Sequence, residues 1–384
     1  MKGYFLKNNG LIIRGLLLIS FFIYSSDISN AQSQSTEDAN EKRKIQIALI
    51  LDTSNSMDGL IDQAKSQLWS IVGTMSGATY EGKDPILEIA LYEYGNDGLS
   101  SENGYIRQIL PLVTDLDDIS SALFSLKTNG GSEYCGMVIQ KSLNELEWSR
   151  SYKDIKMIFV AGNEPFTQGS VNYLSACGNA RAKDVIVNTI HCGSFDKGIY
   201  DKWKDGALVG GGDYMAIQQD RRTVHIQTPY DDRINELSIE LNNTYIYYGN
   251  RGYEKKVQQE REDINASGYS KSYLAKRNSI KASKYYKNES WDLVDAYEAD
   301  SIIVETTDKA KLPAELQDMT TEELEKYVKK QQERRKALQL QIQVLNAQRD
   351  KFIKNKQQSS QVNLGSSMFT AIKKQAIKKK YTIE

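Results

Sequence analysis

Three residues with clear potential for chemistry, Asp52, Ser54 and Ser56, follow the apolar run from Ile45 to Leu51. Their side chains offer one carboxylate and two hydroxyl groups, and hard cations such as Mg²⁺ prefer oxygen ligands of this kind. In an open parallel sheet, ligands bind beyond the carboxyl ends of the strands. An Asp-x-Ser-x-Ser loop at such an end therefore indicates cation-assisted binding rather than bond chemistry.

The elements that would position this loop form an alternating pattern of strands and helices between residues 44 and 228. Apolar runs predict strands over Ile45–Leu51, Leu87–Tyr94, Ile106–Val113, Met157–Ala161, Val185–Cys192 and Thr223–Gln227. A four-residue apolar repeat predicts a helix after the first strand, and further helices are expected over Ile119–Leu126, Gly136–Leu146 and Val171–Lys183. The predicted fold class is α/β, a doubly wound and mostly parallel sheet with a C-terminal helical extension.

The motif in this context resembles the von Willebrand factor type A (VWA) family over roughly residues 44–228. In that family a first loop supplies an Asp and two Ser side chains to a metal-ion-dependent adhesion site, and Asp52, Ser54 and Ser56 match it. A second loop supplies a Thr or Ser hydroxyl, a third supplies an Asp, and a partner protein's acidic side chain takes the open position. The resemblance implies a Rossmann-like fold and a divalent cation, Mg²⁺ or another such as Ca²⁺ or Mn²⁺. It also implies a non-catalytic, protein-binding role.

The second loop is expected within residues 127–136. VWA domains often place the hydroxyl just after a Gly-Gly pair, so Ser132 fits that position, Thr128 is the alternative, and Glu133 could add a carboxylate. A different interpretation also stands, in which Ser132 only caps the helix that follows.

The third loop departs from the family pattern. Where VWA domains have a Thr-Asp-Gly-Glu sequence, this chain has Ala161-Gly162-Asn163-Glu164, so Gly162 occupies the Asp position. Asn163 or Glu164 could reach the metal or its waters instead. Loss of one charged ligand should weaken cation binding, and a degenerate site kept for packing is the alternative.

Other chemistries lack support in the sequence. The Gly210–Gly212 run lacks the Gly-Lys-Ser/Thr ending of a phosphate-binding loop. Neither His191 nor His225 has Ser and Asp partners in a motif, so we expect no hydrolytic triad and no enzyme. Residues 313–384 hold 15 Lys and Arg against 8 Asp and Glu, and the rest of the chain is acidic. That distribution does not match a nucleic-acid-binding face.

The N-terminal residues predict a secreted or periplasmic protein. Positive charges at Lys2, Lys7 and Arg14, an apolar stretch from Leu11 to Ile23 and the small residues of Ser29-Asn30-Ala31 form a signal peptide over residues 1–31. An uncleaved membrane anchor is the alternative. Residues 32–43 read as a linker.

An oxidising compartment has a consequence for the three cysteines, Cys135, Cys177 and Cys192. One pair could form a disulfide there, and the sequence does not choose the pair.

The C-terminal part of the chain is expected to be helical. Residues 229–312 read as a helical subdomain, residues 313–358 as a long helix or a coiled coil, and residues 359–384 as a basic tail. A 3.5-residue spacing runs through Leu324, Val328, Gln331, Arg335, Leu338, Ile342, Leu345, Arg349 and Phe352. This stripe could mediate self-association through residues 313–358 or fold back on the body. The tail could touch an anionic membrane surface.

Two functions follow from these observations. The first is a metal-ion-dependent, adhesion-type VWA protein of the bacterial envelope or exterior. The second is a metal-independent scaffold that acts through its C-terminal coiled coil.

Overall fold

The computed structural model describes residues 42–75, 77–218, 225–356 and 364–383. The chain divides into two units, residues 1–43 and residues 44–384, and every element below lies in the second. The predicted signal peptide, residues 1–31, lies outside the described residues. Within the described ranges, no helix is long and apolar enough to cross a membrane.

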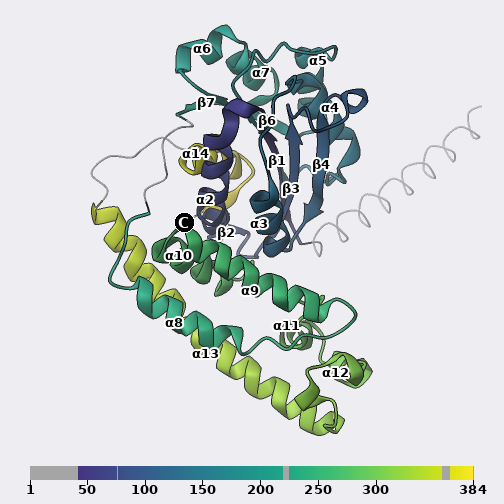
Figure 1. Ribbon diagram of the computed structural model, residues 1–384, viewed down its shortest axis with the longest axis vertical. Helices are drawn as coiled ribbons and strands as arrows, with labels where there is room; N and C mark the ends of the chain where they lie inside the picture. Colours follow the sequence, from purple (N-terminus) through teal and green to yellow (C-terminus); the bar gives the residue numbers. More distant parts are fainter. Residues whose placement is uncertain (1–41, 76, 219–224, 357–363, 384) are drawn as a thin grey trace, which may run out of the picture. The chain divides into compact units, whose positions relative to one another are not determined.

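A six-stranded sheet forms the centre of the second unit (Figure 1). Its strands are β1 (Lys44–Asp52), β3 (Ile86–Tyr94), β4 (Ile106–Val113), β5 (Ile155–Gly162), β6 (Ile186–Cys192) and β7 (Gly211–Ile217). Their order is β4-β3-β1-β5-β6-β7, and every neighbouring pair is parallel except β3–β4. The predicted fold class, an α/β mostly parallel sheet, is confirmed.

Helices cover both faces of this sheet, because its central strands are apolar on both sides. On β1, Ile47 and Leu49 belong to one core cluster, whereas Ala48 and Ile50 belong to the other. The first face carries α2 (Asp58–Met75), α3 (Leu116–Ser125) and α14 (Leu364–Lys378), and the second carries α4 (Cys135–Glu145), α5 (Tyr173–Ala182) and α7 (Trp203–Val209). Figure 1 shows α2 and α14 on one side of the sheet and α4 and α5 on the other.

The sixth strand does not lie where the sequence analysis placed it. The prediction of a strand over Thr223–Gln227 is wrong in its described part, because residues 225–227 form no strand and residues 223–224 lie outside the described ranges. The edge strand is β7, and its residues pair with β6 from Val187 to Cys192. Because β7 opens with Gly211 and Gly212, which have low strand propensity, its pattern resembled a turn.

The region after the sheet is helical, as expected for residues 229–312. It contains α8 (Asp231–Asn242), α9 (Gly252–Tyr269), α10 (Lys271–Lys281), α11 (Leu293–Ala299) and α12 (Ile303–Thr306). A long helix, α13 (Thr321–Lys356), runs along α8 and α11. A reciprocal capping box starts α13, because Thr320 N–H donates to Glu323 Oε2 at 2.9 Å and Glu323 N–H donates to Thr320 Oγ1 at 3.2 Å.

The 3.5-residue stripe of α13 faces its own chain. Seven of its members are buried: Leu324, Val328, Gln331, Arg335, Leu338, Ile342 and Arg349. The two buried arginines pair with carboxylates of the helical region, since Arg335 contacts Asp292 at 2.5 Å and Arg349 contacts Asp231 at 2.8 Å. This arrangement matches the alternative of a single helix that folds back on the body.

The segment expected as a basic tail is packed over its described part. Helix α14 buries Met368, Ile372 and Ala376 against α2, and β8 (Tyr381–Ile383) pairs antiparallel with β2 (Ala78–Tyr80). The prediction of a basic tail over residues 359–384 rested only on its lysines. The apolar residues between them form the buried face of an amphipathic helix.

We predict that Arg335→Gln destabilises the protein by about 3–5 kcal/mol, because removing one partner leaves the Asp292 and Asp295 carboxylates buried and unpaired. The matched control is the neighbouring Arg334→Gln. Arg334 is exposed and contacts Glu240 at only 3.5 Å, so its loss should cost less than about 0.5 kcal/mol. Urea unfolding of both variants measures the difference, and equal losses would contradict a special role for the buried stripe.

Candidate functional site

The candidate site lies where the order of strands reverses. The chain passes from β1 to β3 on one side of β1 and later returns to β5 on the other side. Crevices for ligands form at such a switch point, beyond the carboxyl ends of the strands. Strand β1 ends there with Asp52, and β5 ends with Gly162.

The first loop brings its three predicted residues together. The Asp52 side chain is fully buried, and its Oδ1 accepts a hydrogen bond from Ser54 N–H at 2.8 Å. The hydroxyl oxygens of Ser54 and Ser56 lie 3.3 Å apart. Ser56 is exposed, so the cluster opens to the surface on this side.

The second loop places Glu133, rather than the hydroxyls predicted first, against Asp52. Backbone bonds hold the loop to the first one, because Asn129 N–H donates to Thr53 O at 2.9 Å. A Cβ added at Gly95 would lie 2.7 Å from Glu133 Cγ and 2.8 Å from Asp52 Oδ1. The two acidic side chains therefore approach each other at Gly95, because a glycine has no side chain that would separate them. Their close approach favours a proton on one of them.

Burial governs the charge of this acid pair. Loss of water raises the pKa of Asp52, and hydrogen bonds from Ser54 and Glu133 lower it only in part. The pKa of Glu133 is raised further, first by burial and then by the neighbouring Asp52 charge. Two carboxyl groups in contact cannot both ionise without a counter-charge, so the pair keeps one proton at neutral pH.

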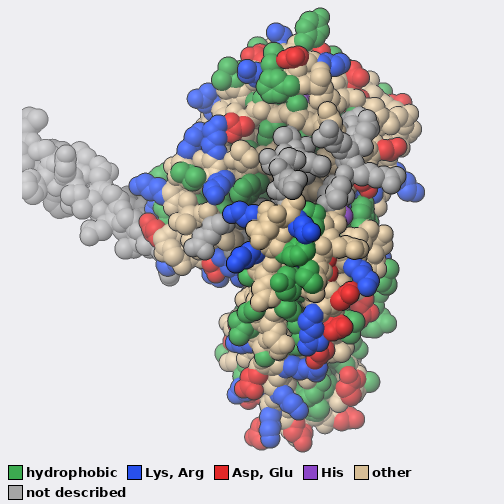
Figure 2. Space-filling view, turned by 90° about the vertical axis from the view of Figure 1, so that its left-hand side faces the viewer, with side chains coloured by type: hydrophobic (Ala, Val, Ile, Leu, Met, Phe, Trp, Pro, Cys, Tyr) green, Lys and Arg blue, Asp and Glu red, His purple; other side chains and the backbone are tan. Residues whose placement is uncertain are grey.

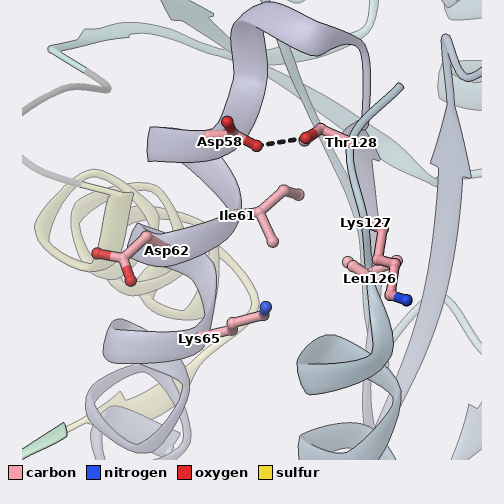
Figure 3. Close-up of a pocket in the computed structure, with 7 residues that line it drawn as sticks. All are labelled: Asp58, Ile61, Asp62, Lys65, Leu126, Lys127 and Thr128. Atoms are coloured by element: carbon pink, nitrogen blue, oxygen red, sulfur yellow. Dashed lines mark hydrogen bonds between the residues drawn. The ribbon is translucent and has the colours of Figure 1, made fainter. Parts of the chain in front are cut away.

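Ser132 and Thr128, the predicted second-loop hydroxyls, have different surroundings. Ser132 is half-buried and does not cap α4, whose N-cap is Tyr134. No hydrogen bond of the Ser132 hydroxyl is found within the described part of the chain. Thr128 donates to Asp58 at the start of α2, as Figure 3 shows, and lines a separate cavity of about 370 Å³ with Lys65 and Lys127.

The third loop contributes Asn163. Its Nδ2 donates to Ser56 Oγ at 3.0 Å, which links the third loop to the first. Glu164 is exposed, but its charge is close enough to raise the pKa of both Asp52 and Glu133.

Tyr94 fills the place of the missing third-loop carboxylate. A Cβ at Gly162 would lie 3.0 Å from Asp52 Oδ2, so a side chain there would point into the site, but it would collide with the Tyr94 hydroxyl. That hydroxyl donates to Ala161 O at 3.1 Å. The sequence analysis missed Tyr94. Its position at the end of the strand beside β1 was the available signal.

The residues present fit a hard cation. Three buried oxygen atoms at this site have no hydrogen-bond partner in the structure: Asp52 Oδ2, Glu133 Oε2 and Asn163 Oδ1. Unpartnered buried oxygens are costly, and a cation or an ordered water can satisfy them. Within the described ranges, no group of three or more His, Cys, Asp and Glu side chains is placed to hold a metal ion, so the donor set is two carboxylates supplemented by hydroxyl and amide oxygens.

One of the three cysteines reaches the edge of this site, since Cys135 Sγ lies 3.5 Å from the Tyr94 hydroxyl. Cys135, Cys177 and Cys192 are all free and buried. The expectation that one pair could form a disulfide is therefore not met in the structure, and burial raises the pKa of each thiol.

Comparisons with known proteins give a fold likeness only. No family model matches the chain, and no curated protein matches it. Among solved structures, the VWA domain of SpRpn10 is 14% identical, with a TM-score of 0.34, covering 45% of this chain and 88% of that one. BatB from Bacteroides thetaiotaomicron is 14% identical, with a TM-score of 0.35, covering 45% and 90%.

A third similar structure is proximal thread matrix protein 1 from the mussel byssus, described with a zinc-occupied MIDAS motif. It is 14% identical, with a TM-score of 0.37, covering 47% of this chain and 43% of that one. The predicted resemblance to VWA domains is confirmed at the level of the fold. The strand order and the Asp-x-Ser-x-Ser loop at the end of β1 carry that conclusion.

We predict that the cation-free protein loses stability as the pH rises. Unfolded carboxyl groups titrate near pH 4, whereas the folded-state pKa is raised to about 6 for Asp52 and about 9 for Glu133. Between about pH 4 and about pH 9 the folded state binds more protons than the unfolded state. The free energy of unfolding therefore falls as the pH rises through this range. Urea unfolding in EDTA from pH 5 to about pH 9 measures this fall. Glu133→Gln should flatten it, and Glu315→Gln, at an exposed position in the helical region, should not.

A second prediction tests whether Tyr94 and Gly162 share one space. Gly162→Asp alone should cost about 1–3 kcal/mol of stability, because the Tyr94 hydroxyl must move. In a Tyr94→Phe background the same substitution should cost less and should raise the affinity for Mn²⁺. Urea unfolding and calorimetric Mn²⁺ titration of the four proteins measure both effects, and strictly additive costs would argue against the shared space.

Proposed function

We propose that this chain is a non-catalytic VWA protein that binds a partner protein through a divalent cation. Mg²⁺ is the first choice, with Ca²⁺ and Mn²⁺ as alternatives. One observation carries the proposal: three loops each bring one buried, unpartnered oxygen atom to the same rim of the sheet, from Asp52, Glu133 and Asn163. Such a set of oxygen donors suits a hard cation.

Each residue has a defined role in this proposal. Asp52 and Glu133 supply carboxylate oxygens, Ser54 and Ser56 supply hydroxyl oxygens, and Asn163 orients Ser56 through its amide. Ser132, which is half-buried, is the additional second-loop candidate. The exposed side of the site, at Ser56, leaves room for an oxygen atom from outside the chain.

The incoming oxygen would come from an acidic side chain of the partner, as in the family that the chain resembles. The affinity of the site for this acidic side chain depends on the charge of Glu133. A divalent cation bound by Asp52 alone keeps a net positive charge, whereas ionised Glu133 cancels that charge. A bound cation favours the ionised form of a carboxyl group that it contacts, so binding of the cation should release the proton of the acid pair.

The proposed location is outside the cytoplasm, in the bacterial envelope or beyond it. The support is the leader-like sequence of residues 1–31. Neither nucleic acid nor a small-molecule substrate is part of the proposal.

The alternative of a scaffold acting through a coiled coil has less support. Its proposed seam is the apolar stripe of α13, and residues such as Leu338 and Ile342 in that stripe are buried within the same chain. Pairing with another chain through this stripe would require α13 to leave α8 and α11.

The test compares the cation response of the chain 32–384 with that of Asp52→Asn. This chain contains the whole of the compact unit 44–384. Mg²⁺ or Mn²⁺ at about 100 times its dissociation constant should stabilise the unsubstituted chain by about 2.7 kcal/mol, measured by thermal unfolding. Asp52→Asn should lose this response but keep its stability in EDTA, because one of two buried carboxyls in contact has become neutral.

The control is Glu315→Gln, which removes an exposed carboxylate in the helical region, outside the three site loops, and should keep the response. Equal stabilisation of the unsubstituted chain and Asp52→Asn would contradict the proposed cation site. Capture of envelope proteins with Mg²⁺ and with EDTA then tests the partner. Capture that ignores EDTA would favour the scaffold.

A further inference from the structure

Helix α13 carries a second stripe on the side opposite its buried one. Its members follow one another at alternating spacings of four and three residues: Glu333, Ala337, Leu340, Val344, Ala347 and Lys351. All six are exposed, Leu340 by 62% and Val344 by 53% of their surfaces. Alternating spacings of three and four place residues on one face of a helix and form the seam of a coiled coil.

This outer stripe is available without any rearrangement of the fold. The inner stripe of the same helix is occupied by α8, α10 and α11 of its own chain. Figure 2 shows a face of the molecule on which hydrophobic side chains lie among Lys and Arg side chains. Neighbouring charges are already engaged within the chain, since Arg334 contacts Glu240 at 3.5 Å and Lys336 contacts Glu298 at 3.4 Å.

The outer stripe is symmetric about residue 342. When two copies of the helix cross antiparallel at that residue, Leu340 of one lies opposite Val344 of the other. Ala337 lies opposite Ala347, and Glu333 lies opposite Lys351. The two ends therefore bring together opposite charges, and each pair occurs twice, as a two-fold interface requires. A parallel arrangement would instead place like charges together.

We propose that a second copy of this chain binds antiparallel along the outer stripe of α13. A second copy is the expected partner because the stripe is complementary to itself. Its apolar positions meet apolar positions, and its small alanines meet alanines and permit close approach. Its terminal charges meet opposite charges. Lys330 and Lys354, one step further out, would meet each other, so favourable pairing ends at residues 333 and 351.

The size of the surface sets the strength of the interaction. Four apolar side chains per copy bury less than the roughly 1,200–2,000 Å² of a stable interface. We therefore expect a reversible dimer with a dissociation constant in the micromolar range, on the order of 10–100 µM. The cation site takes no part, so the dimer should form equally in EDTA.

The first experiment is analytical ultracentrifugation of residues 32–384 in EDTA, from about 1 to 300 µM, a range that brackets this affinity. The unsubstituted chain should pass from monomer to dimer across the range. Leu340→Glu should remain monomeric, whereas Ile264→Glu, at a similarly exposed position on α9, should dimerise normally. Unfolding midpoints of both variants should stay unchanged, because neither side chain is buried.

A charge exchange tests the antiparallel register. Glu333→Lys and Lys351→Glu should each weaken the dimer by about three- to ten-fold, and the double variant should restore it. A chain that stays monomeric at every concentration overturns the proposal, as does a dimer that Leu340→Glu leaves intact. A dimer that the double variant does not restore overturns the register and with it the proposed pairing.

Discussion

The buried guanidinium group of Arg277 holds the two halves of the compact unit together. From α10 it donates to Asp117 on α3 at 2.7 Å and to Asp263 on α9 at 2.6 Å, and it lies over the Trp69 ring of α2. A buried charge is tolerated only where its partners are in place, so this one group fixes four helices relative to each other. Because α2 starts at the cation-site loop, the helical region also supports the site from the far end of that helix.

The candidate site differs from this ion-pair cluster, since two acidic groups are buried there in contact, without a basic partner among the residues that the structure describes. Asp52 and Glu133 meet at Gly95, where burial raises the pKa of both and the Asp52 charge raises that of Glu133 further. In the absence of a cation this pair keeps a single proton, and Asp52 Oδ2 and Glu133 Oε2 have no hydrogen-bond partner in the structure. The protein keeps these groups at a cost to its own stability, which is typical of sites that bind a ligand. The loss of the third-loop carboxylate is thus balanced by a carboxylate from the second loop.

Local sequence patterns predicted the elements better than the contacts between them. Asp52, Ser54 and Ser56 could be predicted because a strand, a loop and a helix place them within five residues of one another. Glu133 could be only an alternative, because its contact with Asp52 depends on how two distant loops pack over Gly95. Similarly, the periodicity of α13 predicted a buried stripe, but nothing local in the sequence distinguishes burial against the same chain from burial against another. The edge strand β7 was misplaced because its glycines resemble a turn.

The small sheet formed by β2 and β8 affects when the protein can finish folding during its synthesis. Ala78 pairs with Ile383, more than 300 residues later, and α14 covers a face of α2 that belongs to the first core cluster. During synthesis, that face of α2 stays uncovered until residues 364–383 have emerged. The nascent protein therefore has a long window in which it is incompletely packed and exposed to proteases.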